Sequence, residues 1–179
     1  MGTKTGISYE EFLHAGKEGQ RWECVDGEVV FMSSPVFRPD GRITIKLDRR
    51  LDEYTDSHPE WVGYGTDTAF TMAAGNWRCP DAALVRKERV DAADPSGPAP
   101  FAPDIAFEVL SPGDTRDEVQ GKRQDYYESN VVQVWLDPGR GTAEVISLNR
   151  PAQFFRGDQV MTIPELPDFR LELKALFSI

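Results

Sequence analysis

Residues 131–136 form an almost wholly apolar stretch, Val-Val-Gln-Val-Trp-Leu. A strand that lacks the alternation of apolar and polar side chains is typical of the centre of a sheet that is covered on both faces. Another apolar strand is predicted over 104–110, and a Ser-Pro-Gly turn ends it. Helices are predicted over 40–57 and 115–129. The sequence therefore predicts an α/β fold with a mixed central sheet flanked by helices.

Spacing and capping signals indicate the helices. The helix over 40–57 carries apolar residues at helical spacing, namely Ile43, Leu47, Leu51 and Tyr54. A Thr-Arg-Asp-Glu sequence, which is a capping box, opens the helix over 115–129. A similar Ser-Tyr-Glu-Glu sequence predicts a short helix over 8–15.

An N-terminal β-hairpin is predicted over 21–32. Its centre, Asp26-Gly27, suits a type I′ turn, in which both residues have positive φ. Further strands are predicted over 61–72, 79–86 and 142–148, and 159–179 is expected to add strands and a last helix. The stretch 91–103, rich in Pro, Ala, Gly and Ser, is short enough for a surface loop. We therefore expect a single domain, 1–179.

Composition argues against a membrane protein and against a zinc site. No apolar run approaches the roughly 20 residues that cross a bilayer, and residues 1–6 lack the apolar core of a signal peptide. We therefore expect a cytoplasmic protein. The two cysteines, Cys24 and Cys79, and the two histidines, His14 and His58, do not have the spacing of zinc ligands. Both cysteines are expected to be small buried residues without a disulfide.

Two acidic residues lie in strands whose other residues are apolar. Asp81 stands at the head of the strand predicted over 79–86. In the strand over 104–110, side chains alternate between faces, so Glu108 lies on the face opposite to Phe107. Burying an ionised carboxylate is costly unless it is paired or binds a metal. Asp81 and Glu108 are therefore candidate site residues.

Lys122 is a third charged residue at an unexpected position. It shares one stripe of its predicted helix with Val119 and Tyr126, and that stripe is expected to pack on the sheet. Two carboxylates and a lysine are the groups that metal-assisted phosphodiester hydrolysis uses. One or two carboxylates suffice for Mg²⁺, which keeps several waters, and the metal activates a bound water. A lysine orients or deprotonates that water, or offsets negative charge.

Four stretches of the chain carry a resemblance to a known family. They are Trp22-Glu23-Cys24-Val25-Asp26-Gly27-Glu28, Pro80-Asp81, 103–112 and 122–138. Together they resemble the Uma-two family, a large bacterial family of endonuclease-type proteins with the PD-(D/E)XK core. The Glu-Val-Leu-Ser-Pro sequence followed by Lys-x3-Tyr is fairly specific, whereas Pro-Asp alone is a weak signal. The resemblance runs over about residues 8–148.

The resemblance implies a restriction-endonuclease-like fold and a set of site residues. Asp81 and Glu108 match the carboxylates that bind Mg²⁺ or Mn²⁺. Lys122 matches a catalytic lysine displaced onto the helix, because Leu110 occupies the usual strand position. Glu23 matches an acidic residue of the first hairpin that faces the same site and supports the metal.

One position departs from the family pattern. Near the start of the second helix such proteins often carry a histidine, and this chain has Asp40. Aspartate is a common helix N-cap, and we expect Asp40 to cap the helix. The departure puts a role for this position in doubt but does not affect the core site.

Each candidate also has an ordinary structural explanation. Asp81 is alternatively a surface residue at a strand edge, and Glu108 a buried glutamate paired with an arginine. Lys122 could extend its ammonium into water, and Glu23 could be an exposed hairpin residue. Tyr126 is expected to be a core residue rather than one that stacks on bases.

The net charge of −10 argues against a nucleic-acid partner, because such proteins usually present a basic face. Bound cations offset part of the charge, and basic residues gather over 42–50 and 116–123. The charge favours an alternative, a catalytically silent nuclease-fold binding module whose acidic surface docks a basic protein partner. A glycosidase with paired carboxylates explains less, since the chain is small for that role and Lys122 would have no function there.

The sequence as a whole favours metal-dependent hydrolysis of a phosphodiester, with DNA as the expected substrate. The expected catalytic residues are Asp81, Glu108, Lys122 and Glu23, and the expected metal ligands are Asp81 and Glu108. A homodimer is expected, since two sites cut both strands of a duplex most simply.

Overall fold

The computed structural model describes residues 22–31, 38–93 and 99–178. Its strands are β1 (Trp22–Val25), β2 (Glu28–Phe31), β3 (Trp61–Gly65), β4 (Phe70–Thr71), β5 (Trp77–Arg78), β6 (Ala82–Arg86), β7 (Ile105–Val109), β8 (Val132–Asp137), β9 (Thr142–Ile146), β10 (Gln153–Arg156), β11 (Val160–Ile163) and β12 (Leu166–Glu172). Its helices are α2 (Arg38–Ser57), α3 (Lys87–Asp91), α4 (Arg116–Glu128) and α5 (Leu173–Phe177).

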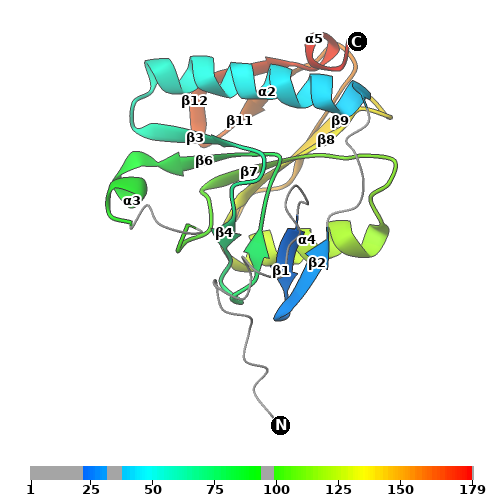
Figure 1. Ribbon diagram of the computed structural model, residues 1–179. Coiled ribbons are helices and arrows are strands. Elements are labelled where there is room, and N and C mark those ends of the chain that lie inside the picture. Colours follow the sequence, from blue (N-terminus) through cyan, green and yellow to red (C-terminus); the bar gives the residue numbers. More distant parts are fainter. Residues whose placement is uncertain (1–21, 32–37, 94–98, 179) are drawn as a thin grey trace.

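A mixed six-stranded sheet forms the centre of the fold, with the strand order β10-β9-β8-β7-β6-β3 (Figure 1). Strands β7 and β8 pair in parallel, and their connection contains α4. The other neighbouring strands pair antiparallel. The first five residues of β8 are buried, which confirms the prediction of a central strand covered on both faces.

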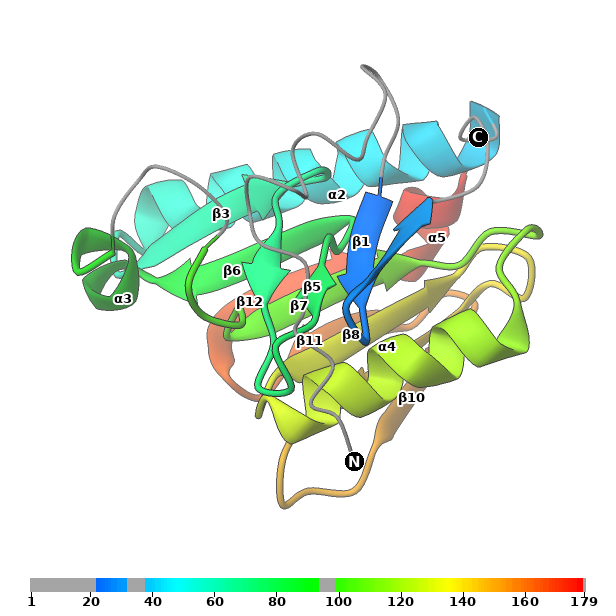
Figure 2. The ribbon, with the colours of Figure 1, turned by 60° about the horizontal axis from the view of Figure 1, so that its bottom comes forward.

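Each face of the central sheet has its own apolar core. Helix α2, together with α5 and the β11–β12 pair, covers one face, and its core includes Leu47, Phe107 and Phe169. Helix α4 lies on the other face, where Tyr126 and Trp135 pack with Phe70 (Figure 2). The predicted α/β fold with a sheet flanked by helices is confirmed. In the part of the chain that the structure describes, no helix has both the length and the apolar character to span a membrane.

The N-terminal hairpin belongs to a second, four-stranded sheet with the order β2-β1-β5-β4. Asp26 and Gly27 join β1 to β2 with φ angles of 52° and 77°. Positive φ at both positions is the requirement of a type I′ turn, so the predicted hairpin is confirmed. The pairing of β1 with β5 places the hairpin beside the chain that leads into β6.

Two of the predicted strands differ from the structure. The stretch 61–72 forms β3 and β4, which belong to different sheets, because the chain turns between them at Asp67 with a φ of 70°. The stretch 79–86 becomes a strand only at Ala82. The short helix α3 follows directly after β6, ahead of the predicted loop. Local composition did not distinguish these boundaries, which depend on pairing between distant residues.

The helices also test the sequence signals. The capping box of α4 is confirmed: Glu118 N–H donates to Thr115 Oγ1 at 3.3 Å, and Thr115 N–H donates to Glu118 Oε2 at 2.8 Å. Helix α2 begins at Arg38, so the prediction that Asp40 is its N-cap is wrong. Pro39 suits the first turn of a helix, which accounts for the earlier start. The helix predicted over 8–15 lies outside the described residues.

The two-sided core predicts unequal effects of two phenylalanine substitutions. Phe107 is fully buried in β7, whereas Phe154 of β10 is 72% exposed. Phe107→Ala should lower the free energy of unfolding by about 3–5 kcal/mol, because it leaves a cavity in the core. Phe154→Ala should change it by less than about 0.5 kcal/mol. Urea unfolding measures both, and equal losses would contradict the assigned core.

Candidate functional site

Glu108 lies on β7 with its side chain on the face of the sheet that α4 covers. Its neighbour Phe107 packs into the core on the α2 face, while Ala106 packs into the core on the α4 face. This is the alternation expected of the strand. Glu108 is only 5% exposed. A carboxylate this deeply buried needs partners to remain ionised.

Lys122 and Tyr126 are the partners of Glu108. Lys122 Nζ lies 2.9 Å from Glu108 Oε2 and 3.1 Å from Oε1, and the Tyr126 hydroxyl donates to Oε1 at 2.6 Å. Lys122 and Tyr126 lie one turn apart on the buried stripe of α4. The lysine therefore points toward the sheet, not into water. Tyr126 is a core residue, as expected, but its bond to Glu108 was missed by the sequence analysis.

Glu23 of β1 contacts the same lysine. Its Oε1 atom lies 3.5 Å from Lys122 Nζ, and its side chain is 1% exposed. Arg78 Nη1 donates to Glu23 Oε2 at 2.7 Å, and the Cys79 N–H donates to Oε1 at 3.1 Å. Glu23 is thus a buried, paired residue and not an exposed hairpin residue. Cys79 and Cys24 are both buried, as predicted.

Asp81 joins this group through the backbone of β7. The Val109 N–H donates to Asp81 Oδ2 at 2.8 Å. Asp81 directly precedes β6, whose Ala82 pairs with Phe107, so the aspartate lies alongside Glu108. The structure therefore brings all four predicted residues together. Glu23 and Glu108 both contact Lys122 directly. Asp81 lies next to this group, where it accepts a hydrogen bond from the Val109 backbone.

The electrostatics of the group favour a protonated lysine. Burial, with the charges of Asp81 and Glu23 in addition, raises the pKa of Glu108 from 4.5 to about 7, although Lys122 and Tyr126 oppose the change. Burial alone would lower the pKa of Lys122, but the carboxylates of Glu108 and Glu23 outweigh it and raise that pKa above its usual value. Lys122 is therefore held as an ammonium, which can offset negative charge but does not accept a proton.

Two further carboxylates, which the sequence analysis did not identify, approach Asp81. Burial, followed by the charge of Asp81, raises the pKa of Asp48 on α2. Burial also raises the pKa of Asp114 in the loop before α4, where Asp81 acts in the same direction and the Ser111 N–H and Lys122 act against it. Asp48 directly follows Leu47, one of the apolar residues that mark the buried stripe of α2. This position next to the stripe is the sequence signal that could have identified Asp48.

The buried part of the cluster contains more carboxylates than cations. The buried acids are Glu23, Glu108 and Asp125, with Asp81 half-buried beside them, and the buried bases are Arg78 and Lys122. Within residues 22–31, 38–93 and 99–178, no three His, Cys, Asp or Glu side chains gather as a metal-binding group.

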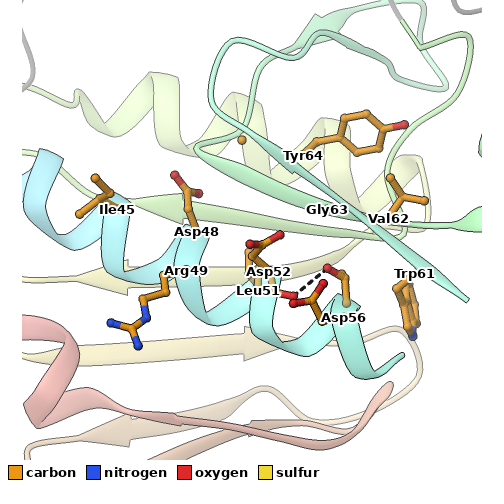
Figure 3. A pocket seen from close by; sticks show the side chains of 12 residues that line it. Ile45, Asp48, Arg49, Leu51, Asp52, Asp56, Trp61, Val62, Gly63 and Tyr64 are labelled. Carbon is orange, nitrogen blue, oxygen red and sulfur yellow. Dashed lines mark hydrogen bonds between the residues drawn. The ribbon is translucent and has the colours of Figure 1, made fainter. Parts of the chain in front are cut away.

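A groove of about 660 Å³ runs between α2 and the edge strand β3 (Figure 3). One stripe of α2 lines it with Asp48, Asp52 and Asp56, and β3 contributes Gly63 and Gly65. The Cβ of a residue at position 65 would meet no atom within 4 Å, so the groove is open at this end. The charge of Asp81 contributes to the raised pKa of Asp48, so the groove reaches the neighbourhood of Asp81. Its charged lining consists of the three aspartates and Arg49.

Comparisons with known proteins agree with the fold. The sequence profile of the Uma2 family, which is described as "Putative restriction endonuclease", matches residues 9–174. No curated protein sequence matches the chain. A crystal structure of a "putative nuclease belonging to DUF820" from Anabaena variabilis ATCC 29413 has a TM-score of 0.78 at 18% identity, covering 96% of this chain and 97% of that chain. This likeness confirms the fold.

A cryo-EM structure of a DrdV–DNA complex is also similar in part. It has a TM-score of 0.37 at 16% identity, and the match covers 63% of this chain and 12% of that chain. A likeness this low carries no inference about the present chain.

The raised pKa of Glu108 predicts a pH dependence of stability in the metal-free protein. The folded-state pKa is about 7 and the ordinary value is 4.5, so between these values the folded state keeps a proton that the unfolded chain releases. The free energy of unfolding should therefore fall as the pH rises through this window. The total change is at most roughly 3–4 kcal/mol, since one pKa unit corresponds to about 1.4 kcal/mol.

Urea unfolding across this pH window tests the assignment. The Glu108→Gln variant should lose the slope, because its side chain does not titrate. Asp158→Asn, which changes an exposed acid between β10 and β11, should keep it. A slope that persists unchanged in Glu108→Gln would show that another group causes it.

Proposed function

The chain belongs to the Uma2 family, and from this we propose that it is a metal-dependent nuclease that hydrolyses phosphodiester bonds in DNA. The observation that carries the proposal is the buried contact of Glu23, Glu108 and Lys122 beside Asp81. These are the groups of metal-assisted phosphodiester hydrolysis, and they come from the hairpin, the central sheet and α4.

Asp81 and Glu108 are the residues that would hold Mg²⁺ or Mn²⁺. Both are hard oxygen donors, and one or two carboxylates suffice for Mg²⁺. The pKa of Glu108 is raised to about 7, chiefly by burial and further by Asp81 and Glu23, so its ionised form lacks full stabilisation in the metal-free protein. A bound divalent cation would stabilise the ionised carboxylate.

The residues around the metal position have separate roles. When bound, the metal ion would lower the pKa of a coordinated water and stabilise negative charge on the phosphate. The Lys122 ammonium is held by Glu108 and Glu23, and it offsets charge that develops on the phosphate oxygens. Tyr126 fixes the orientation of the Glu108 carboxylate through its 2.6 Å hydrogen bond.

The substrate and the assembly complete the proposal. The family description supports DNA as the substrate. A homodimer would place two sites on a duplex and cut both strands. The net charge of −10 means that substrate binding relies on local basic residues and on the bound metal.

Cleavage of DNA in the presence of Mn²⁺ or Mg²⁺ tests the function. Wild-type protein should cleave, and Asp81→Ala and Glu108→Ala should each lower kcat by at least about 100-fold, because each removes a metal ligand. Asp158→Asn serves as the matched control and should keep wild-type activity. Purified wild-type protein that cleaves neither single- nor double-stranded DNA or RNA, and that equals Asp81→Ala, would refute the enzymatic proposal.

The acidic groove favours a second candidate function, a binding module that docks a basic protein partner. Strand β3 lies at the edge of the sheet, and Asp52 and Asp56 line the groove beside it. An extended peptide can add to such an edge through main-chain hydrogen bonds. Its lysine and arginine side chains would then meet the aspartates of α2.

Calorimetry separates the two functions. The nuclease proposal expects Mn²⁺ binding that is lost in Glu108→Ala. If the protein is a binding module, we expect no metal binding at millimolar Mn²⁺ and measurable binding of a lysine-rich peptide. The affinity for the peptide should fall at least about 5-fold in the doubly substituted Asp52→Asn, Asp56→Asn protein, because both contacts lose their charge. A peptide that binds this variant and wild type equally would exclude the groove as the docking site.

A further inference from the structure

Arg78 of β5 joins three parts of the structure. Its Nη1 atom donates to Glu23 Oε2 of β1 at 2.7 Å, and its Nε atom donates to Asp125 Oδ2 of α4 at 2.6 Å. All three side chains are almost fully buried. Hydrogen bonds between charged groups are short and strong. One guanidinium therefore ties the hairpin to the helix that carries Lys122.

The same network reaches the turn of the hairpin. Asn76 Nδ2 donates to Asp125 Oδ1 at 2.9 Å, and the Asp26 N–H donates to Asn76 Oδ1 at 2.8 Å. Asn76 is 6% exposed, and its amide is satisfied on both sides, by the buried Asp125 carboxylate and by the backbone of the hairpin turn. The hairpin is thus held against α4 at its turn as well as at Glu23.

The carboxylate of Glu23 is held by these contacts. One oxygen accepts from Arg78, and the other accepts from the Cys79 N–H and faces Lys122 Nζ at 3.5 Å. A carboxylate fixed in this way holds the ammonium in place.

Gly121 provides the space that Arg78 occupies. A Cβ at position 121 would lie 3.3 Å from Arg78 Nη2, which is tighter than an ordinary contact. Because Glu23 and Asp125 hold the guanidinium from two sides, it cannot move away without lengthening those bonds. Glycine at position 121 therefore leaves the room that the Arg78 guanidinium needs in this position.

We propose that Arg78 is a positioning residue of the nuclease site, which acts by holding Glu23 where Glu23 and Glu108 together fix the Lys122 ammonium. The inference rests on the proposed function and deepens it. It assigns Arg78 and Glu23 to the placement of the lysine and leaves metal binding to Asp81 and Glu108. Without Arg78, the buried Glu23 lacks its guanidinium partner and draws Lys122 away from Glu108.

The activity test compares Arg78→Gln, Arg78→Lys and Gly121→Ala with Arg89→Gln. Arg89 pairs with Asp104 at the far end of β7, so its loss removes an arginine ion pair outside the site. Arg78→Gln should lower kcat by at least about 10-fold, because a small misplacement of a reacting group is costly. Its dissociation constant for Mn²⁺ should stay within about 3-fold of wild type, because the metal ligands are unchanged. Arg78→Lys should recover part of kcat, and Arg89→Gln should keep it.

Gly121→Ala separates positioning from a merely structural role. Alanine favours a helix interior over glycine by about 1 kcal/mol, so the thermal midpoint should not fall. kcat should nevertheless fall by about 2- to 5-fold, because Arg78 is displaced. The proposal is overturned if folded Arg78→Gln and Gly121→Ala proteins both keep kcat within about twofold of wild type. Parallel loss of kcat and Mn²⁺ binding would overturn it as well.

A second readout needs no nuclease activity. In the metal-free protein, the rate at which an amine-acylating reagent modifies Lys122, followed by mass spectrometry, should rise in Arg78→Gln and Gly121→Ala but not in Arg89→Gln. If wild-type protein cleaves no nucleic acid and these rates rise, the proposed function fails while the positioning contact stands. If wild type cleaves and both kcat and the rates are unchanged in the variants, the positioning role alone is refuted.

Discussion

The buried ion pair between Glu108 and Lys122 constrains how α4 sits on the central sheet. Taking either charge out of water alone would cost several kcal/mol, so both are tolerated only where they meet. Their atoms approach to 2.9 Å, and the Tyr126 hydroxyl satisfies one glutamate oxygen as well. The helix is therefore fixed in register against β7, because a shift of one turn would leave two unpaired buried charges.

The same pair determines the chemistry that the site can offer. The surrounding carboxylates raise the pKa of Lys122, although its burial acts the other way, and the amine is kept as an ammonium. Burial raises the pKa of Glu108 to about 7, with Asp81 and Glu23 adding to the effect. Two buried cations, Arg78 and Lys122, thus lie among the carboxylates of Glu23, Glu108 and Asp125. These properties arise from the packing of rigid elements, not from any single residue.

The two faces of the sheet divide the molecule into regions of different character. The face that α4 and the four-stranded sheet cover contains the buried polar cluster. In this cluster Arg78 connects Glu23 with Asp125. The face under α2 is an apolar core that ends in an acidic groove along β3. Asp48 links the two regions, since it lines the groove and approaches Asp81. The three aspartates of the groove contribute to the net charge of −10.

By itself, the sequence determined features that depend on local geometry. Strand alternation placed Glu108 opposite Phe107, helical spacing placed Lys122 on the buried stripe, and Asp26-Gly27 specified the hairpin turn. These signals involve residues a few positions apart, whose relative orientation the backbone period fixes.

Only the tertiary structure decided the contacts between distant parts of the chain. The link from Glu23 through Arg78 to Asp125 and the hydrogen bond of Tyr126 to Glu108 have no local signature. The same holds for the division of 61–72 between two sheets. Such contacts follow from the pairing and packing of whole elements. Nothing in the neighbouring sequence distinguishes the residues that make them from other polar or aromatic residues.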